Sequence, residues 1–176
     1  MTTGGVVAVV GNPKPASRTR DAAEIVGRRL ATLAGVTDPL SVIDLADHGP
    51  KLLGWGDPTV AELTATVIGA RALVIATPTY KAAYTGLLKL FLDQFDAGAL
   101  HGIPTVALMT GGSLAHALAV DVHLVPVLVE IGASCPARGL FLAGPDVDSP
   151  EPAVAQWFDT ATPALARALG GSGAGA

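Results

Sequence analysis

The chain has 176 residues, which suits one domain with a single core, and half of its residues are hydrophobic. Only 15% of the residues are charged and the net charge is −4, so the composition excludes a nucleic-acid partner and an anionic membrane surface. Soluble monomers carry about 25% charged residues, so this sparse charge indicates that part of the surface is covered in an oligomer.

The N-terminus and the single cysteine bear on where the protein works. Residues 1–5, MTTGG, lack the basic and apolar segments of a signal peptide, so we predict a disordered N-terminus and a cytoplasmic protein. Cys135 has no partner for an internal disulfide, which fits a reducing compartment. We predict that it is a small buried apolar residue and not a reactive thiol. Residues 97–120 carry no Asp, Glu, Lys or Arg, but their glycines and Pro104 argue against a membrane span.

The first predicted strand, residues 6–10, is wholly apolar and leads into a loop with two prolines. Ser17 is a natural N-cap for a helix over residues 18–34. Free N–H groups at that helix start, with the Ser17 hydroxyl and the Arg18 cation, suit a phosphate dianion. The alternative is an ordinary capped helix with an exposed arginine. The loop matches neither the nucleoside triphosphate loop nor the usual dinucleotide fingerprint.

A second strand is predicted over residues 40–45 and a helix over residues 59–70. Residues 48–58 between them are rich in glycine and proline and should be irregular. We predict that Trp55 packs under this loop; the alternatives are a lid over a pocket and a contact with a partner subunit.

The third predicted strand, residues 72–76, is a short apolar run that should be buried on both faces. Residues 77–80 then break it, because Pro78 removes a backbone donor and the chain should leave the sheet there. Ligands of open α/β sheets bind at this edge. The tyrosines, lysine and hydroxyls that follow suit a flat, partly polar aromatic ligand; the alternative is an ordinary loop with surface tyrosines.

The helix predicted over residues 85–95 has an unusually broad apolar arc. A helix that covers one face of a sheet needs a narrower stripe. We therefore predict that its second flank is buried in a homodimer or homotetramer, with deeper burial in the monomer as the alternative.

A fourth strand, residues 104–109, should end in the polar turn of residues 110–113. Gly111 and Gly112 would let the backbone approach a ligand, with consecutive N–H groups facing ring carbonyls, unless this is a plain tight turn. Ser113 should cap a long helix that reaches about residue 132. Pro126 interrupts that helix, so we expect a kink or local widening there.

Residues 139–143 should form a fifth strand and residues 150–169 a closing helix, with residues 171–176 as a flexible tail to a domain over residues 6–170. The alternation of apolar strands and helices predicts a single α/β domain with a parallel sheet and right-handed crossovers.

A hydrolase triad of Ser113, His116 and Asp121 is the competing interpretation of the loop after the fourth strand. Ser113 does not lie in a G-x-S-x-G elbow, and all three residues fall on one predicted helix. We therefore reject nucleophilic catalysis, and we predict no metal site.

Three loops at strand carboxyl ends thus carry complementary chemistry: one for a phosphate, one for an aromatic ring and one for the ring's polar edge. A phosphorylated flavin needs all three. The chain resembles the NAD(P)H-dependent FMN reductases of the flavodoxin-like superfamily, especially the reductase components of two-component alkanesulfonate monooxygenase systems. The resemblance spans nearly the whole chain and lies in ATPTYKAAYTGLLK (76–89), TGGSLAHALAVD (110–121), PVL (126–128) and GNPKPASRT (11–19).

The resemblance implies a three-layer sandwich with a five-stranded parallel sheet in the order 2-1-3-4-5, and a dimer or tetramer core at the helix after Tyr84. It implies FMN and NADPH or NADH as cofactors. It also implies three sets of flavin contacts. These are Asn12, Ser17, Arg18 and Thr19 around the phosphate, Pro78, Thr79, Tyr80 and Lys81 along the isoalloxazine, and Thr110, Gly111, Gly112 and Ser113 at its polar edge.

The chain departs from the sulfonate-associated members in one place. Those members carry a tyrosine or histidine after the VD pair, in a widened helical turn near the flavin, whereas Val122 follows Asp121 here and His123 comes one place later. Whether His123 replaces the aromatic contact or merely packs stays open.

The expected activity is hydride transfer from NAD(P)H to FMN, with reduced flavin supplied to a partner monooxygenase. Lys81 and the amides of Gly111 and Gly112 would stabilise negative charge on the reduced ring. Two alternatives use the same fold: an enzyme that retains FMN and reduces a quinone, azo dye or metal ion, and a non-enzymatic electron-transfer flavodoxin. The second is disfavoured because such carriers are usually much more acidic.

Overall fold

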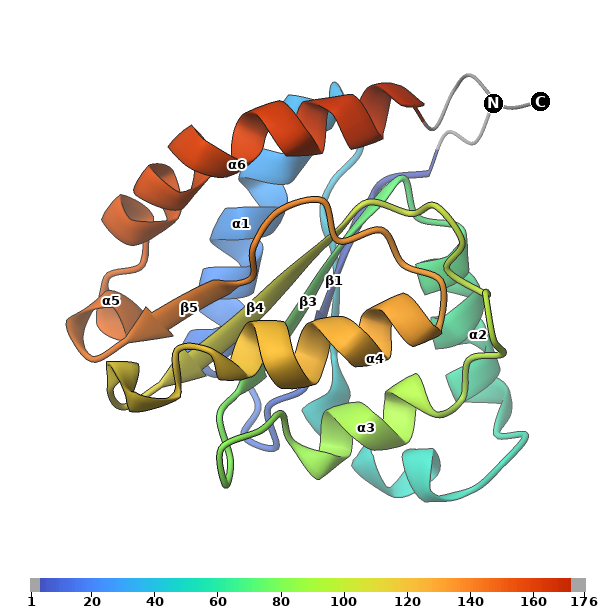
Figure 1. The fold of residues 1–176 in the computed structure, drawn as a ribbon. Helices are drawn as coiled ribbons and strands as arrows, with labels where there is room; N and C mark the ends of the chain where they lie inside the picture. The colour runs from blue at the N-terminus through green and yellow to red at the C-terminus, as the bar shows by residue number, and fades with distance from the viewer. Residues whose placement is uncertain (1–3, 172–176) are drawn as a thin grey trace.

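The computed structural model describes residues 4–171, and residues 1–3 and 172–176 of the predicted tails lie outside them. Five parallel strands form one sheet in the order β2-β1-β3-β4-β5 (Figure 1). This order confirms the predicted flavodoxin-like α/β fold, in which the connections change direction between β1 and β3. The strands are β1 (Val6–Val10), β2 (Ser41–Asp44), β3 (Ala72–Pro78), β4 (Thr105–Gly111) and β5 (Leu140–Ala143).

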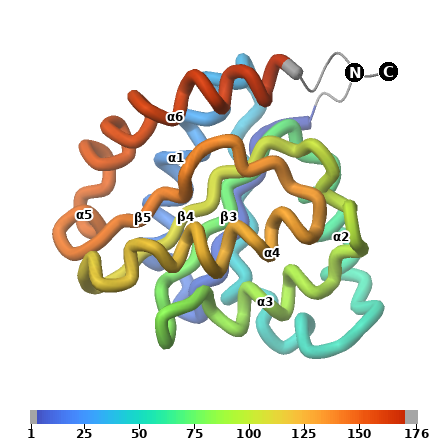
Figure 2. Tube along the Cα trace, viewed as in Figure 1, coloured from blue at the N-terminus to red at the C-terminus, as the bar shows by residue number. Residues whose placement is uncertain are grey.

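Helices cover both faces of the sheet, which gives three layers (Figure 2). Alternate residues of β1 point to opposite faces, so Val7 and Val9 belong to one apolar core and Val6, Ala8 and Val10 to the other. The core around Val6 is closed by α1 (Arg18–Ala34), α5 (Pro145–Asp148) and α6 (Glu151–Gly171). The opposite core is closed by α2 (Pro58–Ile68), α3 (Gly86–Leu92) and α4 (Val125–Glu130).

Strand β3 runs two residues further than the sequence predicts, so the expected break at Thr77 and Pro78 is wrong. Pro78 still pairs in register with Thr110, and the N–H of Thr79 donates to the Thr110 carbonyl at 2.7 Å. Because donors alternate sides along a strand, the missing donor of Pro78 would face β1, which has already ended opposite Ala76. The proline therefore costs the sheet no hydrogen bond.

Strand β4 is also longer than predicted and includes Thr110 and Gly111, which the sequence assigns to a turn. The polar turn that remains consists of Gly112 and Ser113. The residues that were expected to approach a ligand are thus held partly by the sheet.

The long helix expected after Ser113 is irregular. It begins with a 3-10 turn, η3 (Leu114–His116), and continues through a π turn, η4 (Val120–Leu124), before α4. In η4 the N–H of Val125 donates to the carbonyl of Val120, five residues earlier. The predicted widening is confirmed, and it lies directly before Pro126, which cannot donate and would clash with the preceding turn of a regular helix.

The segment after β2 folds into two 3-10 turns, η1 (Leu45–Asp47) and η2 (Gly49–Leu53). Leu52 is the residue of η2 that packs into the core, whereas Trp55 is 77% exposed. The prediction that Trp55 packs under the loop is therefore wrong, because the buried position at this end is already filled by Leu52.

The broad apolar arc of α3 is largely covered within the monomer. Leu88, Phe91 and Leu92 are buried, and Leu87 and Leu90 are half-buried against the same core. This outcome fits the alternative of deeper burial for this helix. Four exposed apolar residues, Leu114, Leu118, Val122 and Val129, lie on the segment from η3 to α4. Others, among them Leu53 and Trp55, lie in and after η2.

A membrane-crossing helix is absent from residues 4–171, where none of the helices is both long and apolar enough to span a bilayer.

Candidate functional site

Three loops were predicted to bind a ligand: the first over residues 11–19, the second from residue 77 and the third over residues 110–113. They meet in one hollow at the carboxyl edge of the sheet. The hollow has a volume of about 810 Å³, within the usual range for small-molecule sites. We call it the main hollow. Of the predicted residues, it is lined by Asn12, Ser17, Arg18, Thr19, Pro78, Thr79, Tyr80, Thr110, Gly111 and Gly112.

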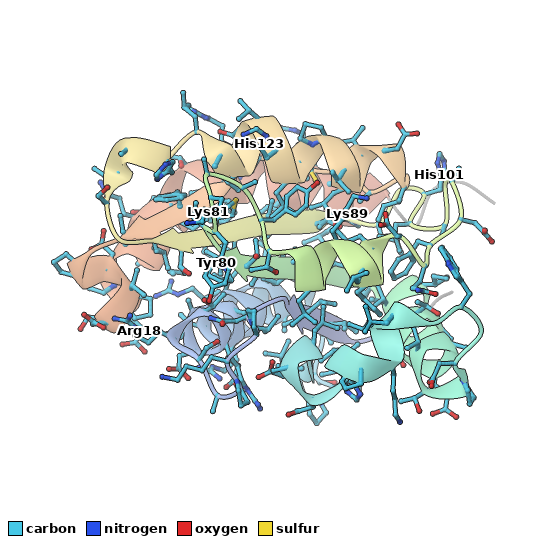
Figure 3. All side chains as sticks on the ribbon, turned by 90° about the horizontal axis from the view of Figure 1, so that it is seen from below. Arg18, Tyr80, Lys81, Lys89, His101 and His123 are labelled. Carbon is cyan, nitrogen blue, oxygen red and sulfur yellow. The ribbon has the colours of Figure 1, made fainter. Side chains whose placement is uncertain are left out.

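A second hollow of about 500 Å³, the side hollow, adjoins the main hollow and shares Thr79, Gly111 and Gly112 with it. It is lined by the two remaining predicted residues, Lys81 and Ser113. Figure 3 shows Arg18, Tyr80 and Lys81 toward one end of the molecule, far from His101 at the other.

The first loop presents a helix N-terminus to the main hollow. Ser17 is the N-cap of α1, and its side chain accepts a hydrogen bond from the N–H of Arg20 at 3.3 Å. The N–H groups of Arg18 and Thr19 lie in the first turn, where a helix offers no acceptor, and none of the other residues in the described part of the chain accepts from them. Two free donors and the positive end of the helix dipole favour an anion here.

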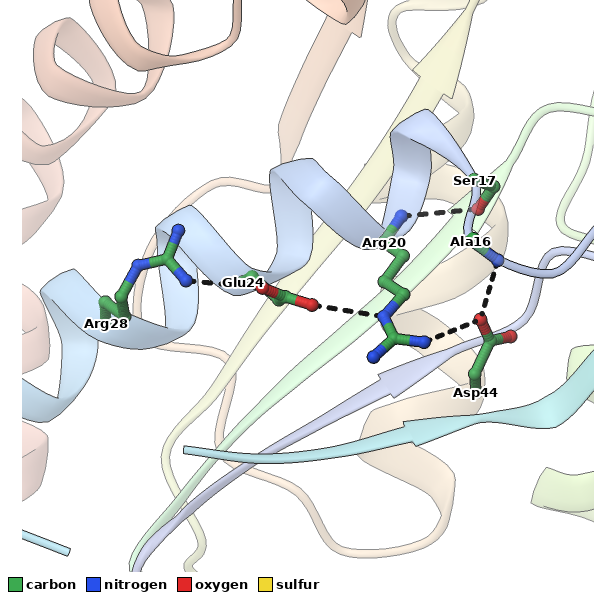
Figure 4. Close-up of polar contacts among 6 residues, drawn as sticks. All are labelled: Ala16, Ser17, Arg20, Glu24, Arg28 and Asp44. Carbon is green, nitrogen blue, oxygen red and sulfur yellow. Dashed lines mark hydrogen bonds and ion pairs between the residues drawn. The ribbon is translucent and has the colours of Figure 1, made fainter. Parts of the chain in front are cut away.

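Asp44 holds this loop against the sheet (Figure 4). Ala16 adopts a left-handed backbone conformation, with φ of 48°, and its N–H donates to Oδ2 of Asp44 at 3.4 Å. The same carboxylate accepts from the N–H of Ala46 at 3.3 Å and lies 3.6 Å from Nη1 of Arg20. Because Asp44 is buried, it can hold the strained residue before Ser17 in place.

Arg20 is turned along the outside of α1 and does not line the main hollow (Figure 4). Its Nε donates to Glu24 at 3.1 Å, and Glu24 also pairs with Arg28 at 3.3 Å. The hydrogen bond to Glu24 is the main reason that the pKa of Arg20 is raised. The cations that line the main hollow are therefore Arg18 and Lys14.

The hydroxyl of Thr19 connects the first loop to the third. Its Oγ1 lies 2.9 Å from Oγ1 of Thr110, and Nδ2 of Asn12 donates to it at 3.2 Å. Both threonines are buried. The side chains of Asn12 and Thr19 thus fix the loops relative to each other, which leaves the backbone of Thr19 as its contribution to ligand binding.

Thr85 connects the second loop to the first. It is the N-cap of α3, and its hydroxyl donates to the carbonyl of Gly11 at 2.5 Å, while its N–H donates to Oγ1 of Thr77 at 3.1 Å. Gly11 also packs directly against Leu88, whose Cβ would lie 2.5 Å from a Cβ placed on the glycine. No other residue fits at position 11 without moving α3.

The second loop contains an unpaired buried hydroxyl. Oγ1 of Thr79 is the one buried side-chain nitrogen or oxygen atom within residues 4–171 that has no hydrogen-bond partner. A buried polar atom without a partner costs free energy, so its position beside both hollows indicates that a polar ligand atom completes it. FMN, with its polar ring edge and phosphate, fits the donors present.

Beyond Thr79, the chain makes a strained two-residue turn. Tyr80 and Ala83 exchange two backbone hydrogen bonds of 2.8 and 3.1 Å, while Lys81 and Ala82 have φ of 51° and 66°. Turns with two left-handed residues normally use Asn-Gly. Strain of this kind concentrates at ligand sites, and here the turn holds Tyr80 and Lys81 over the two hollows.

The third loop depends on close packing at Gly111. A Cβ at this position would lie 2.7 Å from Cζ of Phe141, so any other residue would require the Phe141 ring to shift. A Cβ at Gly112 would meet nothing within 4 Å. The backbone of Gly112 therefore faces open space at the junction of the two hollows.

A fourth loop, which the sequence analysis missed, completes the main hollow. Gly144, Val147 and Asp148, from the end of β5 and α5, line it. Gly144 follows a strand directly, with φ of 55°. The rule that ligands bind at the carboxyl ends of strands, which led to the other three loops, would therefore have found it. The first loop and α1 also contribute Lys14, Ala16 and Asp21, which were not predicted.

Ser113 and His116 of the rejected triad line the side hollow, whereas Asp121 is engaged elsewhere. Asp121 accepts a hydrogen bond from the N–H of Gly139 at 2.8 Å and pairs with Arg138 at 3.2 Å. The hydroxyl of Ser113 accepts from the N–H of Ala115 at 3.4 Å. His123 is exposed and lines neither hollow in the monomer.

The fold and the site define a class of protein. A doubly wound sheet with an anion site at the first helix, a ring-sized hollow beside it and polar donors at the far edge is a flavodoxin-like flavoprotein.

Residues 5–148 match the family model of the NADPH-dependent FMN reductases, and the chain belongs to this family. It is 34% identical over 136 residues to an FMN reductase (NADPH) of Escherichia coli (strain K12), which covers 77% of this chain and 71% of that protein. It is 40% identical over 72 residues to the NADH-dependent FMN reductase SfnF of Pseudomonas putida, which covers 41% of this chain and 39% of that protein. A solved NADH:FMN oxidoreductase in its apo form superposes with a TM-score of 0.74 at 30% identity, over 96% of this chain and 87% of that one.

Family membership confirms the predicted class of enzyme. The protein is an oxidoreductase, and FMN and a nicotinamide nucleotide are the cofactors that its family uses.

Proposed function

We propose that this protein transfers a hydride from NADPH or NADH to FMN and releases the reduced flavin to a partner monooxygenase. The observation that carries the proposal is the convergence of three loops on one hollow with unpaired polar groups at both ends. These are the first-turn N–H groups of α1 at one end and the hydroxyl of Thr79 at the other.

The flavin phosphate binds at the start of α1, where Ser17, Arg18 and Thr19 supply a dipole, a cation and free N–H groups. Pro78, Thr79, Tyr80 and Lys81 would hold the isoalloxazine, and residues 110–113 would hold its polar edge. The hydrogen bonds from Thr19 to Thr110 and from Thr85 to Gly11 keep these loops in register, so the site is largely formed before the ligand arrives.

Bound FMN supplies the acceptor for the two electrons and proton of the nicotinamide hydride. The protein would hold the nicotinamide and flavin rings in a productive orientation for hydride transfer. Lys81 and the N–H of Gly112 would stabilise negative charge on the reduced ring, whereas the N–H of Gly111 faces β5 within the sheet. Since hydride transfer needs no general base, the absence of a role for His116 and Asp121 is consistent with the proposal.

The relatives support release of the flavin as product. Those compared above are named as reductases of FMN, which treats the flavin as the substrate that is turned over. One is named for NADPH and two for NADH, so both donors belong in the assay.

The protein works as a homodimer or homotetramer in this proposal. Leu118, Val122 and Val129 are each more than half exposed on the segment from η3 to α4, an apolar surface that a second copy would cover. The single cysteine supports a reducing compartment, and we place the protein in the cytoplasm.

The experiment is to record the visible spectrum of the purified protein and then follow NADPH and NADH oxidation without oxygen, with and without added FMN. We expect little bound flavin and oxidation of one nucleotide per added FMN. A protein that purifies with stoichiometric FMN, and turns over only when a quinone or dye is added, would contradict release and favour a flavin-retaining reductase.

A further inference from the structure

One of the two cations that line the main hollow, Arg18, is already paired with an acid. Nη1 of Arg18 lies 2.5 Å from Oδ1 of Asp148, and the two residues are 130 positions apart in the sequence. Both side chains line the main hollow. Asp148 is the last residue of α5 and makes no other side-chain hydrogen bond or ion pair within residues 4–171.

The charges around this end of the hollow nearly cancel. Lys14 and Arg18 are the basic side chains that line it, and Asp21 and Asp148 are the acidic ones. A site built to retain a phosphate dianion would be expected to carry an excess of positive charge. Here the phosphate depends on the helix dipole, the free N–H groups and a shared arginine.

We propose that Asp148 competes with the flavin phosphate for Arg18 and thereby lowers the affinity for FMN, so that the flavin exchanges during turnover. The inference rests on the proposed function, because it assumes that FMN binds with its phosphate at the start of α1. It assigns Asp148 as a determinant of flavin affinity that does not itself take part in hydride transfer.

The size of the effect follows from the exposure of the pair. Both side chains are well exposed, at 65% for Arg18 and 63% for Asp148. An exposed ion pair of this kind is weak, so a dianion displaces it. Removal of the carboxylate charge should therefore tighten FMN about three- to tenfold and should not abolish or create binding.

The test is a fluorescence titration of FMN and riboflavin into the wild-type protein and the single variants Asp148→Asn, Asp146→Asn and Arg18→Ala. The double variant that combines Arg18→Ala with Asp148→Asn is titrated in the same way. Asp146→Asn is the matched control, because it removes the same charge from the same short helix. Asp146 is exposed and does not line the hollow. Thermal unfolding of each variant monitors the fold.

We expect Asp148→Asn to tighten FMN about three- to tenfold and to leave riboflavin, which has no phosphate, unchanged. The control should change neither ligand, and the effect of Asp148→Asn should largely disappear when Arg18 is alanine. Equal tightening by Asp146→Asn, a change that extends to riboflavin, or undiminished tightening without Arg18 would overturn the proposal.

The same titration separates this inference from the proposed function. If the wild-type protein bound neither flavin, the proposed function would fail first. If it bound and reduced FMN but Asp148→Asn left the affinity unchanged, only the competition for Arg18 would be wrong.

Discussion

At the scale of single residues, the hydroxyl of Thr79 should lower the stability of the ligand-free protein and raise its affinity for FMN. Its buried Oγ1 lacks a partner, whereas its N–H is bound within the sheet. Thr79→Val keeps the shape and removes the unpaired group. We expect the free energy of unfolding without ligand to rise by about 1 kcal/mol, and FMN affinity to fall about fivefold. Chemical denaturation and flavin titration measure the two effects.

Thr77 provides the matched control for this prediction. It is a buried threonine two positions earlier, but its Oγ1 donates to the Pro78 carbonyl and accepts from the N–H of Thr85. Thr77→Val should therefore lower the free energy of unfolding by about 1–3 kcal/mol, because the N–H of Thr85 is left unpaired. If both variants shifted stability in the same direction, the unpaired state of Thr79 would be disproved.

Cys135 is predicted to be unreactive in the folded protein. Cys135 is half-buried against the core around Val7, not fully buried as expected, and this burial raises the pKa of its thiol from 9.0 to about 11. The folded state thus holds the thiol proton more tightly than the unfolded chain, which contributes stability below pH 9.0 that is lost as the pH rises through about 11. Near neutral pH the native thiol should react with a disulfide reagent about 100-fold more slowly than in denaturant. Equal rates in the two states would contradict burial.

Much of the lining of the candidate site could be predicted at this scale, because hydroxyl, glycine and basic residues cluster where apolar strands end. All twelve predicted flavin contacts line one of the two hollows. Asp148 could not be predicted in the same way. Its contact with Arg18 joins residues 130 positions apart, and no local pattern encodes such a pair.

At the scale of the elements, the first loop depends on a carboxylate from the next strand. Asp44→Ala removes the acceptor of the N–H groups of Ala16 and Ala46. We expect a loss of about 1–3 kcal/mol in the free energy of unfolding. FMN should weaken more than riboflavin, because the loop carries the phosphate contacts. Denaturation and paired flavin titrations test both expectations.

Asp47→Ala is the control for this variant, since Asp47 is exposed at the end of η1 and makes no hydrogen bond to the loop. It should leave stability and flavin affinity close to wild type. A loss of affinity for FMN and riboflavin by equal factors in Asp44→Ala would show that the carboxylate supports the fold but does not position the phosphate loop.

The element boundaries show where sequence patterns are informative. β1 and α1 match their predicted ranges, because an unbroken apolar run and a clear N-cap define them. β3 and β4 run further than expected, because whether Pro78 and Gly111 stay in the sheet depends on which neighbouring strands are still present. A kink or local widening near Pro126 was expected from the proline, but its form as a π turn of five residues depends on packing.

At the scale of the whole molecule, the exposed face from η3 to α4 predicts self-association. Val122 is 56% exposed within it. Val122→Glu should shift the protein toward monomers in sedimentation, because a buried carboxylate without a partner is costly at an interface. Leu53→Glu, at an apolar position in η2 that is 74% exposed, is the control and should not change the assembly. If Val122→Glu sedimented like the wild-type protein, the interface would lie elsewhere.

The layered architecture could be predicted from the alternation of apolar strands and helices, but the strand order came from the resemblance to the reductase family. Hydrophobic periodicity places each element on the sheet without saying which strands are neighbours. The position of the exposed apolar surface was harder to predict than the strand order. The apolar arc of α3 is mostly covered within the monomer, and the exposed residues lie on an irregular helix whose phase the sequence does not define.

The central claim is that the flavin phosphate binds at the start of α1, and the most direct test compares FMN with riboflavin in Arg18→Ala. We expect FMN affinity to fall about 10- to 100-fold, as for loss of a charge-assisted contact, and riboflavin affinity to stay within about twofold of wild type. Arg29→Ala, an exposed arginine on the same helix outside the hollow, should change neither. Equal losses for FMN and riboflavin in Arg18→Ala would contradict the claim and place the phosphate elsewhere.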